Sequence, residues 1–125
     1  MRILLSTWLA AALCCVAVDS MAANRALIVS IGQGYAAHGI TPIAGPEVDQ
    51  RLAKKIALDM GFQDGEIKYL SEDEATGRNI RSGFEWVKAG VRPGDKVFIY
   101  YSGHGTQVEA GGKEGGCEQA LVPVD

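Results

Sequence analysis

The residue best placed for acid–base chemistry is His104, which lies in the tetrapeptide Ser102-Gly103-His104-Gly105. It follows the apolar and aromatic run 96–101 (KVFIYY), the strongest strand signal in the chain, and open α/β sheets bind ligands at the carboxyl ends of their strands. An imidazole titrates near neutral pH, and Gly103 and Gly105 would let a substrate backbone approach it. The structural alternative is a turn histidine satisfied by backbone groups, and these features alone do not choose between the two.

A nucleophile for such a histidine would be a cysteine, and the chain has three: Cys14, Cys15 and Cys117. The first two lie in an apolar amino-terminal run that is expected to be removed as an export signal. The mature chain would then keep Cys117 alone, without an intrachain disulfide. Cys117 lies beside Glu114 and Glu118, and neighbouring carboxylates raise the pKa of a thiol and suppress its reactive form. These neighbours favour a plain loop cysteine over a nucleophile.

The segment 32–37 (GQGYAA) fits the Gly-x-Gly-x-x-Gly/Ala pattern of dinucleotide-binding loops. That pattern functions when a helix starts at the glycines, so that its amino terminus faces the pyrophosphate. Here the segment 39–46 (GITPIAGP) predicts a loop instead. The acid expected at the end of a second strand is also missing, because Asp49 falls in a helical segment. A dinucleotide-binding module is therefore a remote alternative.

Alternating strand and helix signals must position these groups. Short β-branched runs predict strands over 26–31, 67–70 and 96–101. Two segments between them repeat apolar residues at helical spacing, namely Val48, Leu52, Ile56 and Met60 before Gly61, and Ile80, Phe84, Trp86 and Val87 after a cap at Thr76. The β-α-β-α-β order predicts an α/β fold, a three-layer open parallel sheet with helices on both faces. Three strands make a thin sheet, so the domain is expected to be incomplete.

The amino-terminal segment 1–22 has the organisation of an export signal. A positive charge near its start precedes the apolar run 3–18, and the small residues Ser20 and Ala22 stand where a signal peptidase recognises them. Cleavage after Ala22 would leave one domain over residues 23–125, in the periplasm or outside the cell.

Two other interpretations of this segment stay open. A transmembrane anchor needs about 20 apolar residues, and the run 3–18 is shorter. Translation from Met21 would give a cytoplasmic protein of the same fold. No lipid anchor is predicted, because Leu13 precedes Cys14 where a lipoprotein signal has a small residue.

Charge limits the partners. The formal net charge is −3, from 12 Lys and Arg against 15 Asp and Glu, and no basic cluster forms the stripe that a phosphate backbone would demand. Nucleic acid is therefore not an expected partner.

Several segments together resemble metacaspases and caspases over nearly the whole mature chain. The most specific is YYSGHG at 100–105, followed across a Gly-rich stretch by EQALVPVD at 118–125, which is similar to the histidine segment of this family. The other matching segments are ALIVSIGQGY at 26–35, Gly45 to Asp49 at the start of the first helix, Gly61-Phe62 at its end, and Ala75-Thr76 with Asn79-Ile80 before the second helix. Residues 23–125 therefore resemble the amino-terminal part of a caspase-like peptidase domain of the metacaspase type.

The resemblance implies a cysteine-type endopeptidase with a Cys–His dyad, in which His104 serves a nucleophilic thiol and then protonates the leaving amine. In the family that cysteine lies in an Asp-x-Cys-His-Ser-Gly type segment, after the next core strand and some tens of residues past the histidine. The nucleophile is therefore expected beyond Asp125. The serious alternative is a non-catalytic or truncated caspase-like fragment, which would act only with a missing half of the domain or with another protein.

The resemblance also implies a peptide or protein substrate cut after Arg or Lys, because metacaspases use an acidic specificity pocket. Asp49 matches the pocket aspartate, and Ser102 matches a pocket serine just before the histidine. A carboxylate forms charge-assisted hydrogen bonds with such a cation. The alternative for Asp49 is a solvated residue in the first helical turn, favoured there by the helix dipole.

Two departures from the family pattern bear on the site. Pro46 stands where metacaspases usually have a cysteine. The loop before the Pro-x-Asp segment, which is acid-rich in calcium-dependent members, has few acids here, with Glu114 and Glu118 among them. Calcium is possible by the resemblance, but few carboxylates without a rigid loop make a poor calcium site, so no cofactor and no metal are predicted.

Overall fold

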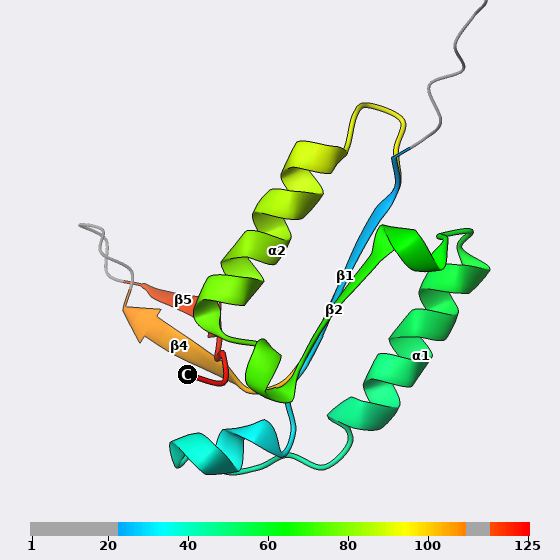
Figure 1. The fold of residues 1–125 in the computed structure, drawn as a ribbon. Coiled ribbons are helices and arrows are strands. Elements are labelled where there is room, and N and C mark those ends of the chain that lie inside the picture. Colours follow the sequence, from blue (N-terminus) through cyan, green and yellow to red (C-terminus); the bar gives the residue numbers. More distant parts are fainter. Residues whose placement is uncertain (1–22, 110–115) are drawn as a thin grey trace, which may run out of the picture.

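The computed structural model describes residues 23–109 and 116–125. Three strands form a parallel sheet in the order β2-β1-β3, two helices connect them, and two further strands pair separately (Figure 1). The elements in chain order are β1 (Arg25–Ser30), η1 (Gly34–His38), α1 (Pro46–Asp59), η2 (Asp64–Glu66), β2 (Ile67–Ser71), η3 (Glu72–Glu74), α2 (Gly77–Gly90), β3 (Val97–Ser102), β4 (Gly105–Glu109) and β5 (Cys117–Leu121), where η marks a short 3-10 helix. The predicted α/β fold with a parallel sheet is confirmed.

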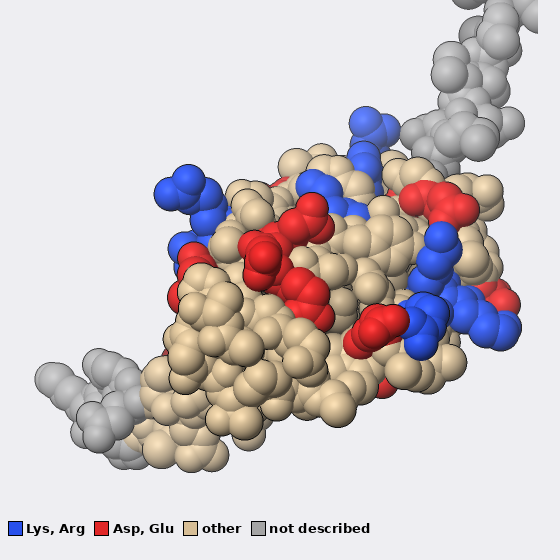
Figure 2. Space-filling model, turned by 60° about the horizontal axis from the view of Figure 1, so that its bottom comes forward, with Lys and Arg blue, Asp and Glu red and all other residues tan. Residues whose placement is uncertain are grey.

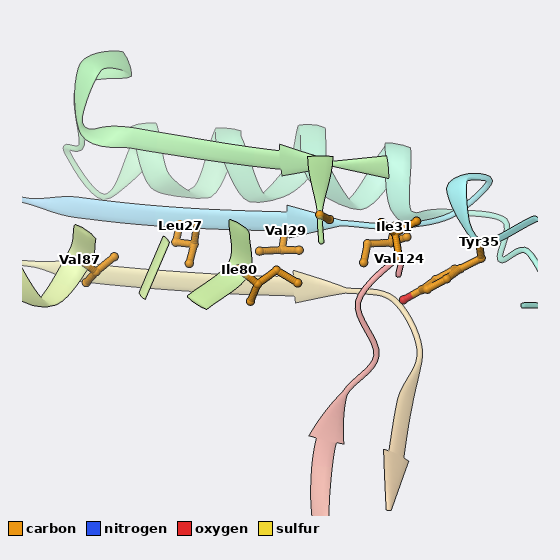
Figure 3. Close-up of a cluster of buried hydrophobic side chains, with 8 residues drawn as sticks. Leu27, Val29, Ile31, Tyr35, Ile80, Val87 and Val124 are labelled. Carbon is orange, nitrogen blue, oxygen red and sulfur yellow. The ribbon is translucent and has the colours of Figure 1, made fainter. Parts of the chain in front are cut away.

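The two helices lie on opposite faces of the sheet, because the side chains of β1 alternate between the faces. Leu27 and Val29 pack in one core cluster with Ile80 and Val87 of α2, as Figure 3 shows. Ala26 and Ile28, on the other face of β1, pack in a second cluster with Ala53 and Ala57 of α1. The three-layer arrangement predicted from the sequence is therefore present.

The three parallel strands end at the same level. Ser30 is the partner of both Ser71 of β2 and Ser102 of β3 in the sheet register. The segments that follow the strands therefore begin at one edge of the sheet, where the sequence analysis placed the chemistry.

Helix α1 buries a different face from the one that its large apolar residues define. Ala53 and Ala57 are fully buried against the sheet. The large residues, called here the α1 stripe, are 43–54% exposed and comprise Val48, Leu52, Ile56 and Met60. At about 100° per residue, the stripe lies roughly 100° around the helix from the buried alanines. The small alanines allow close contact with the sheet, and no described element covers the stripe.

The antiparallel pair of β4 and β5 was not predicted. Gly105 pairs with Leu121 at one end, and Glu109 pairs with Cys117 at the other. The segment that follows β5 returns to the main body, where the Val124 N–H donates to the Ala75 carbonyl at 3.1 Å. Neither strand has a strong signal in the sequence, because both are short and contain several polar residues.

The predicted signal segment 1–22 lies outside the described residues. Among the residues that are described, no helix has the length and apolar character needed to cross a membrane.

Candidate active site

His104 lies in the turn between β3 and β4, at the carboxyl edge of the parallel sheet. It is half-buried, and its ring packs against that of Tyr35, with the two ring centroids 4.8 Å apart. The imidazole is thus placed where open α/β sheets bind ligands, with one side supported by the protein.

The imidazole of His104 is oriented by a backbone carbonyl. Its Nε2 lies 2.7 Å from the carbonyl oxygen of Thr41, in the loop that precedes α1. A carbonyl oxygen only accepts hydrogen bonds, so Nε2 must carry the hydrogen. Nδ1 of the neutral ring is then the nitrogen with a lone pair, and it is the one that can take a proton from a nucleophile.

Asp49 and Ser102, 53 positions apart in the sequence, are in direct contact. The Ser102 hydroxyl donates to Asp49 Oδ2 at 2.6 Å, and both residues are half-buried. Asp49 lies in the first turn of α1 and Ser102 ends β3, two residues before His104. Among the described residues, Oδ1 of Asp49 has no hydrogen-bond partner, so that oxygen is available to a donor from a ligand.

The wider edge of the sheet is acidic. The three residues of η3, which directly follow β2, are Glu72, Asp73 and Glu74. Figure 2 brings the lower end of Figure 1 forward, and it shows acidic side chains gathered near the middle of that face with basic ones at its margins. A cationic ligand would be attracted to this face.

An open groove with a volume of about 690 Å³ adjoins the histidine turn. Its lining includes Tyr101, Gly103, Gly105, Gln107, Gln119 and Leu121. The two glycines predicted to bind substrate therefore both border this groove, between the end of β3 and the β4–β5 pair.

Glu72 fills the position that a phosphate would need in the Gly-x-Gly loop. Its carboxylate accepts the N–H of Gly32 at 3.2 Å and that of Gly34 at 2.5 Å. The glycines are followed by the five-residue 3-10 helix η1, not by a long α-helix. Both donors are thus engaged, and the geometry speaks against the dinucleotide alternative.

Cys117, the only cysteine among the described residues, is exposed at the far end of the β4–β5 pair. Four residues of strand separate its level from that of Gly105, or about 14 Å at about 3.4 Å per residue. Hydrogen-bond contact with His104 is excluded at that separation. In the described part of the chain, no three His, Cys, Asp or Glu side chains are grouped so that they could hold a metal ion, and most of the acid-poor loop considered for calcium, residues 110–115, lies outside it.

Three residues of this site were missed as functional candidates. In the sequence, Tyr35 and Tyr101 stand out only as members of the segments 26–35 and 96–101, and Thr41 only as part of the predicted loop 39–46. A matched aromatic pair could have been suspected from the family segments. Thr41 contributes a main-chain oxygen, which any residue type supplies, so its side chain gives no signal.

Comparison with known proteins places this arrangement in a family. Residues 24–125 match the model of the metacaspase peptidase C14 domain. Metacaspase-3 of Arabidopsis thaliana is 39% identical over 113 residues, which cover 82% of this chain and 30% of the relative. Metacaspase-1 of Lodderomyces elongisporus is 28% identical over 115 residues, covering 82% and 25%, and Metacaspase-1 of Mycosarcoma maydis is 29% identical over 85 residues, covering 62% and 21%.

The fold and the match to this model place the chain in the class of caspase-like α/β domains. The chain belongs to the metacaspase family of C14 peptidases. It spans between about a fifth and a third of the length of the metacaspases it matches.

Proposed function

We propose that this chain supplies the histidine half of a metacaspase-type cysteine endopeptidase, with peptides or proteins as substrates. The observation that carries the proposal is the 2.7 Å contact between His104 Nε2 and the Thr41 carbonyl. It holds the imidazole at the ligand-binding edge of the sheet in the tautomer whose Nδ1 can accept a proton. Family membership supports a cysteine as the proton donor.

The proposed reaction uses His104 twice. Nδ1 takes the proton of a cysteine thiol, and the thiolate attacks the carbonyl carbon of the scissile peptide bond. The imidazolium then protonates the leaving amine, so that the C–N bond breaks and an acyl-enzyme thioester remains. Water, deprotonated by the neutral imidazole, hydrolyses the thioester and restores the thiol. The Thr41 carbonyl stabilises the transient imidazolium through the hydrogen on Nε2.

We also propose that Asp49 and Ser102 form the specificity pocket for an Arg or Lys side chain. The Ser102 hydroxyl fixes one oxygen of the Asp49 carboxylate and leaves the other for a cationic donor. A guanidinium or ammonium group would gain a charge-assisted hydrogen bond there. The acidic face in Figure 2 supports this preference, because it attracts basic substrates over a longer range.

The first test compares two forms of the protein. The purified 125-residue chain should leave Arg- and Lys-terminated fluorogenic peptides uncut, with or without calcium, because Cys117 is too far from His104. A form extended by any in-frame sequence beyond the Asp125 codon that encodes a Cys-His segment should cleave them. Its Cys117→Ala variant should keep full activity.

Two results would contradict this. Turnover by the 125-residue chain that disappears in Cys117→Ala would make Cys117 the nucleophile. An extended form that has the Cys-His segment and is folded, but cleaves no peptide, would refute the peptidase assignment.

A second candidate function is a partner-dependent, non-catalytic fragment, and the exposed apolar surface favours it. The α1 stripe is not the only exposed apolar surface among the described residues. Val97 and Ile99 of β3 are 46% and 47% exposed, and they lie on the face of the sheet opposite α1. Among the described strands β3 lies at the edge of the sheet, with one side unpaired. A polypeptide that adds a strand beside β3 and covers both apolar surfaces would fit. Activity that appears only after mixing with such a partner would favour this candidate.

We propose that the protein is exported, with a mature amino terminus near Ala23. The charge, apolar run and small residues of segment 1–22 support this. Amino-terminal sequencing or intact mass of protein from its native host should therefore find Ala23 first. Retention of Met1 or Met21 would contradict export by this signal.

A further inference from the structure

Two tyrosine hydroxyls hold the main chain of His104 on both sides. The His104 N–H donates to Tyr35 Oη at 3.1 Å, and the Tyr101 hydroxyl donates to the His104 carbonyl oxygen at 2.8 Å. The two tyrosines come from different elements, η1 and β3. Neither hydroxyl is used by the proposed reaction.

The hydrogen atoms of this network can be assigned without conflict. A phenol hydroxyl has one hydrogen to donate and can also accept. Tyr35 gives its hydrogen to the Val122 carbonyl at 2.6 Å, so its oxygen can accept the His104 N–H. Tyr101 gives its hydrogen to the His104 carbonyl, with the Val122 carbonyl at 2.7 Å as a second acceptor. The two hydroxyl oxygens also lie 3.1 Å from each other. Every donor in this assignment has a partner, and a satisfied network of this kind restrains the turn.

Close packing makes the arrangement specific. Tyr35 is fully buried, and its ring also supports the imidazole of His104. A Cβ atom at Gly103 would lie 2.7 Å from the Tyr101 hydroxyl and 2.8 Å from that of Tyr35. Gly103 is therefore required for the two hydroxyls to reach the turn, whatever its contact with substrate. Burial, with a smaller contribution from Tyr35, raises the pKa of Tyr101 well above its ordinary value, so its hydroxyl stays protonated at working pH.

We infer that Tyr35 and Tyr101 are positioning residues that orient the His104 imidazole. Their hydroxyls fix the main chain from which the imidazole projects, and the ring of Tyr35 limits its rotation, so that Nε2 meets the Thr41 carbonyl. Their value for catalysis rests on the proposed function of His104. The reason is that a proton-transfer group displaced by a fraction of an ångström loses much of its efficiency.

The test reads the imidazole directly by NMR of the full ¹⁵N-labelled chain. Long-range ¹H–¹⁵N spectra report which ring nitrogen carries the hydrogen. In the wild type, neutral His104 should be the Nε2–H tautomer, and its main-chain N–H should exchange with solvent at least about tenfold more slowly than an unprotected amide. In Tyr35→Phe and Tyr101→Phe, the Nε2–H to Nδ1–H ratio should fall by a factor of about 3 to 10, as expected for the loss of one neutral hydrogen bond.

Tyr100→Phe is the matched control. Tyr100 neighbours Tyr101 on β3, but its side chain packs in the other core cluster, with Phe98. Its loss of a hydroxyl should leave the His104 signals unchanged, and those of His38 should be unchanged in all three variants. A merely structural role would lower the melting temperature without changing the tautomer of His104.

Each outcome decides the inference. Unchanged His104 tautomer and exchange in folded Tyr35→Phe and Tyr101→Phe would overturn it. If Tyr35→Phe does not fold, the inference is tested by Tyr101→Phe, whose side chain is only half-buried, and by the exchange rate of the wild type. An unprotected His104 amide in the wild type would refute the inference. Because these measurements need no substrate, a complete protein without peptidase activity would refute the proposed function and leave this inference standing.

Discussion

Replacing His104 by alanine in the extended, Cys-bearing form should lower kcat for peptide hydrolysis by a factor of about 10² to 10⁴, the usual contribution of general acid–base catalysis. Alanine removes Nδ1, the nitrogen left with a lone pair when Nε2 donates to the Thr41 carbonyl. KM should change little, because the proposed cation pocket, Asp49 with Ser102, remains intact. Steady-state kinetics with an Arg-terminated fluorogenic peptide would measure both constants.

His38→Ala is the matched control for this substitution, because it removes the other histidine of the chain. His38 lies in the last turn of η1 and has no role in the proposed reaction. Its replacement should leave kcat within about twofold of the wild type. A His104→Ala enzyme that keeps more than about a tenth of the wild-type kcat would contradict the assignment, since a general base contributes at least about a hundredfold.

The features that the sequence predicts correctly, such as the buried strand β1 and the cap of α2, depend only on residues close together in the chain. The β-branched run of β1 fills both faces of the sheet, and its side chains are buried as expected. Thr76 accepts the N–H of Asn79 and caps α2, as its position before the helix predicted. Such features depend on a few neighbouring residues, so their pattern survives without knowledge of the partner elements.

Features that depend on what an element packs against were not accessible in the same way. The spacing of the α1 stripe indicates a helix, but it does not say that Ala53 and Ala57 form the contact with the sheet. Small residues carry little hydrophobic signal, yet they allow a helix to approach a sheet closely. In the same way, Glu72 adopts a positive φ of 48° to bring its carboxylate to Gly32, and nothing local in the sequence predicts that conformation.

The site shows the same division. The glycines that flank His104 after a strong strand made it a candidate, but its catalytic role, like the pocket role of Asp49 and Ser102, came from resemblance to the family. The structure adds that these last two are in contact across 53 positions, with 2.6 Å between their oxygens. The residues that orient His104 act through a main-chain oxygen and through buried hydroxyls. Such groups reveal their role only when the fold brings them together.

Replacing Asp49 by asparagine should remove most of the preference for Arg and Lys while leaving the histidine chemistry in place. Asparagine has the same shape and its side-chain oxygen can still accept the Ser102 hydroxyl, so packing should be preserved. The substitution removes the negative charge and replaces the oxygen proposed to face the cation by an amide NH2 group, which cannot accept a hydrogen bond. If the carboxylate is the main desolvated partner of the substrate cation, the loss should be about 2 to 5 kcal/mol, seen as a raised KM and a lower kcat/KM for basic peptides.

Glu47→Gln provides a matched control in the same first turn of α1. It removes one negative charge from the same helix end, but Glu47 is exposed and paired with Arg51 at 2.8 Å. A general effect of charge on the helix dipole or on substrate attraction should appear in both variants. A pocket effect should appear only in Asp49→Asn.

The competing interpretation makes Asp49 a solvated residue that only stabilises the start of α1. It predicts a loss of about 0.5 to 1 kcal/mol in the free energy of unfolding and no change in selectivity. Rates with Arg- and Asp-terminated peptides, together with urea denaturation of each variant, separate the two. An Asp49→Asn enzyme that keeps its full preference for Arg would refute the pocket. The assignment of His104 would then stand alone, because its orientation by the Thr41 carbonyl involves neither Asp49 nor Ser102.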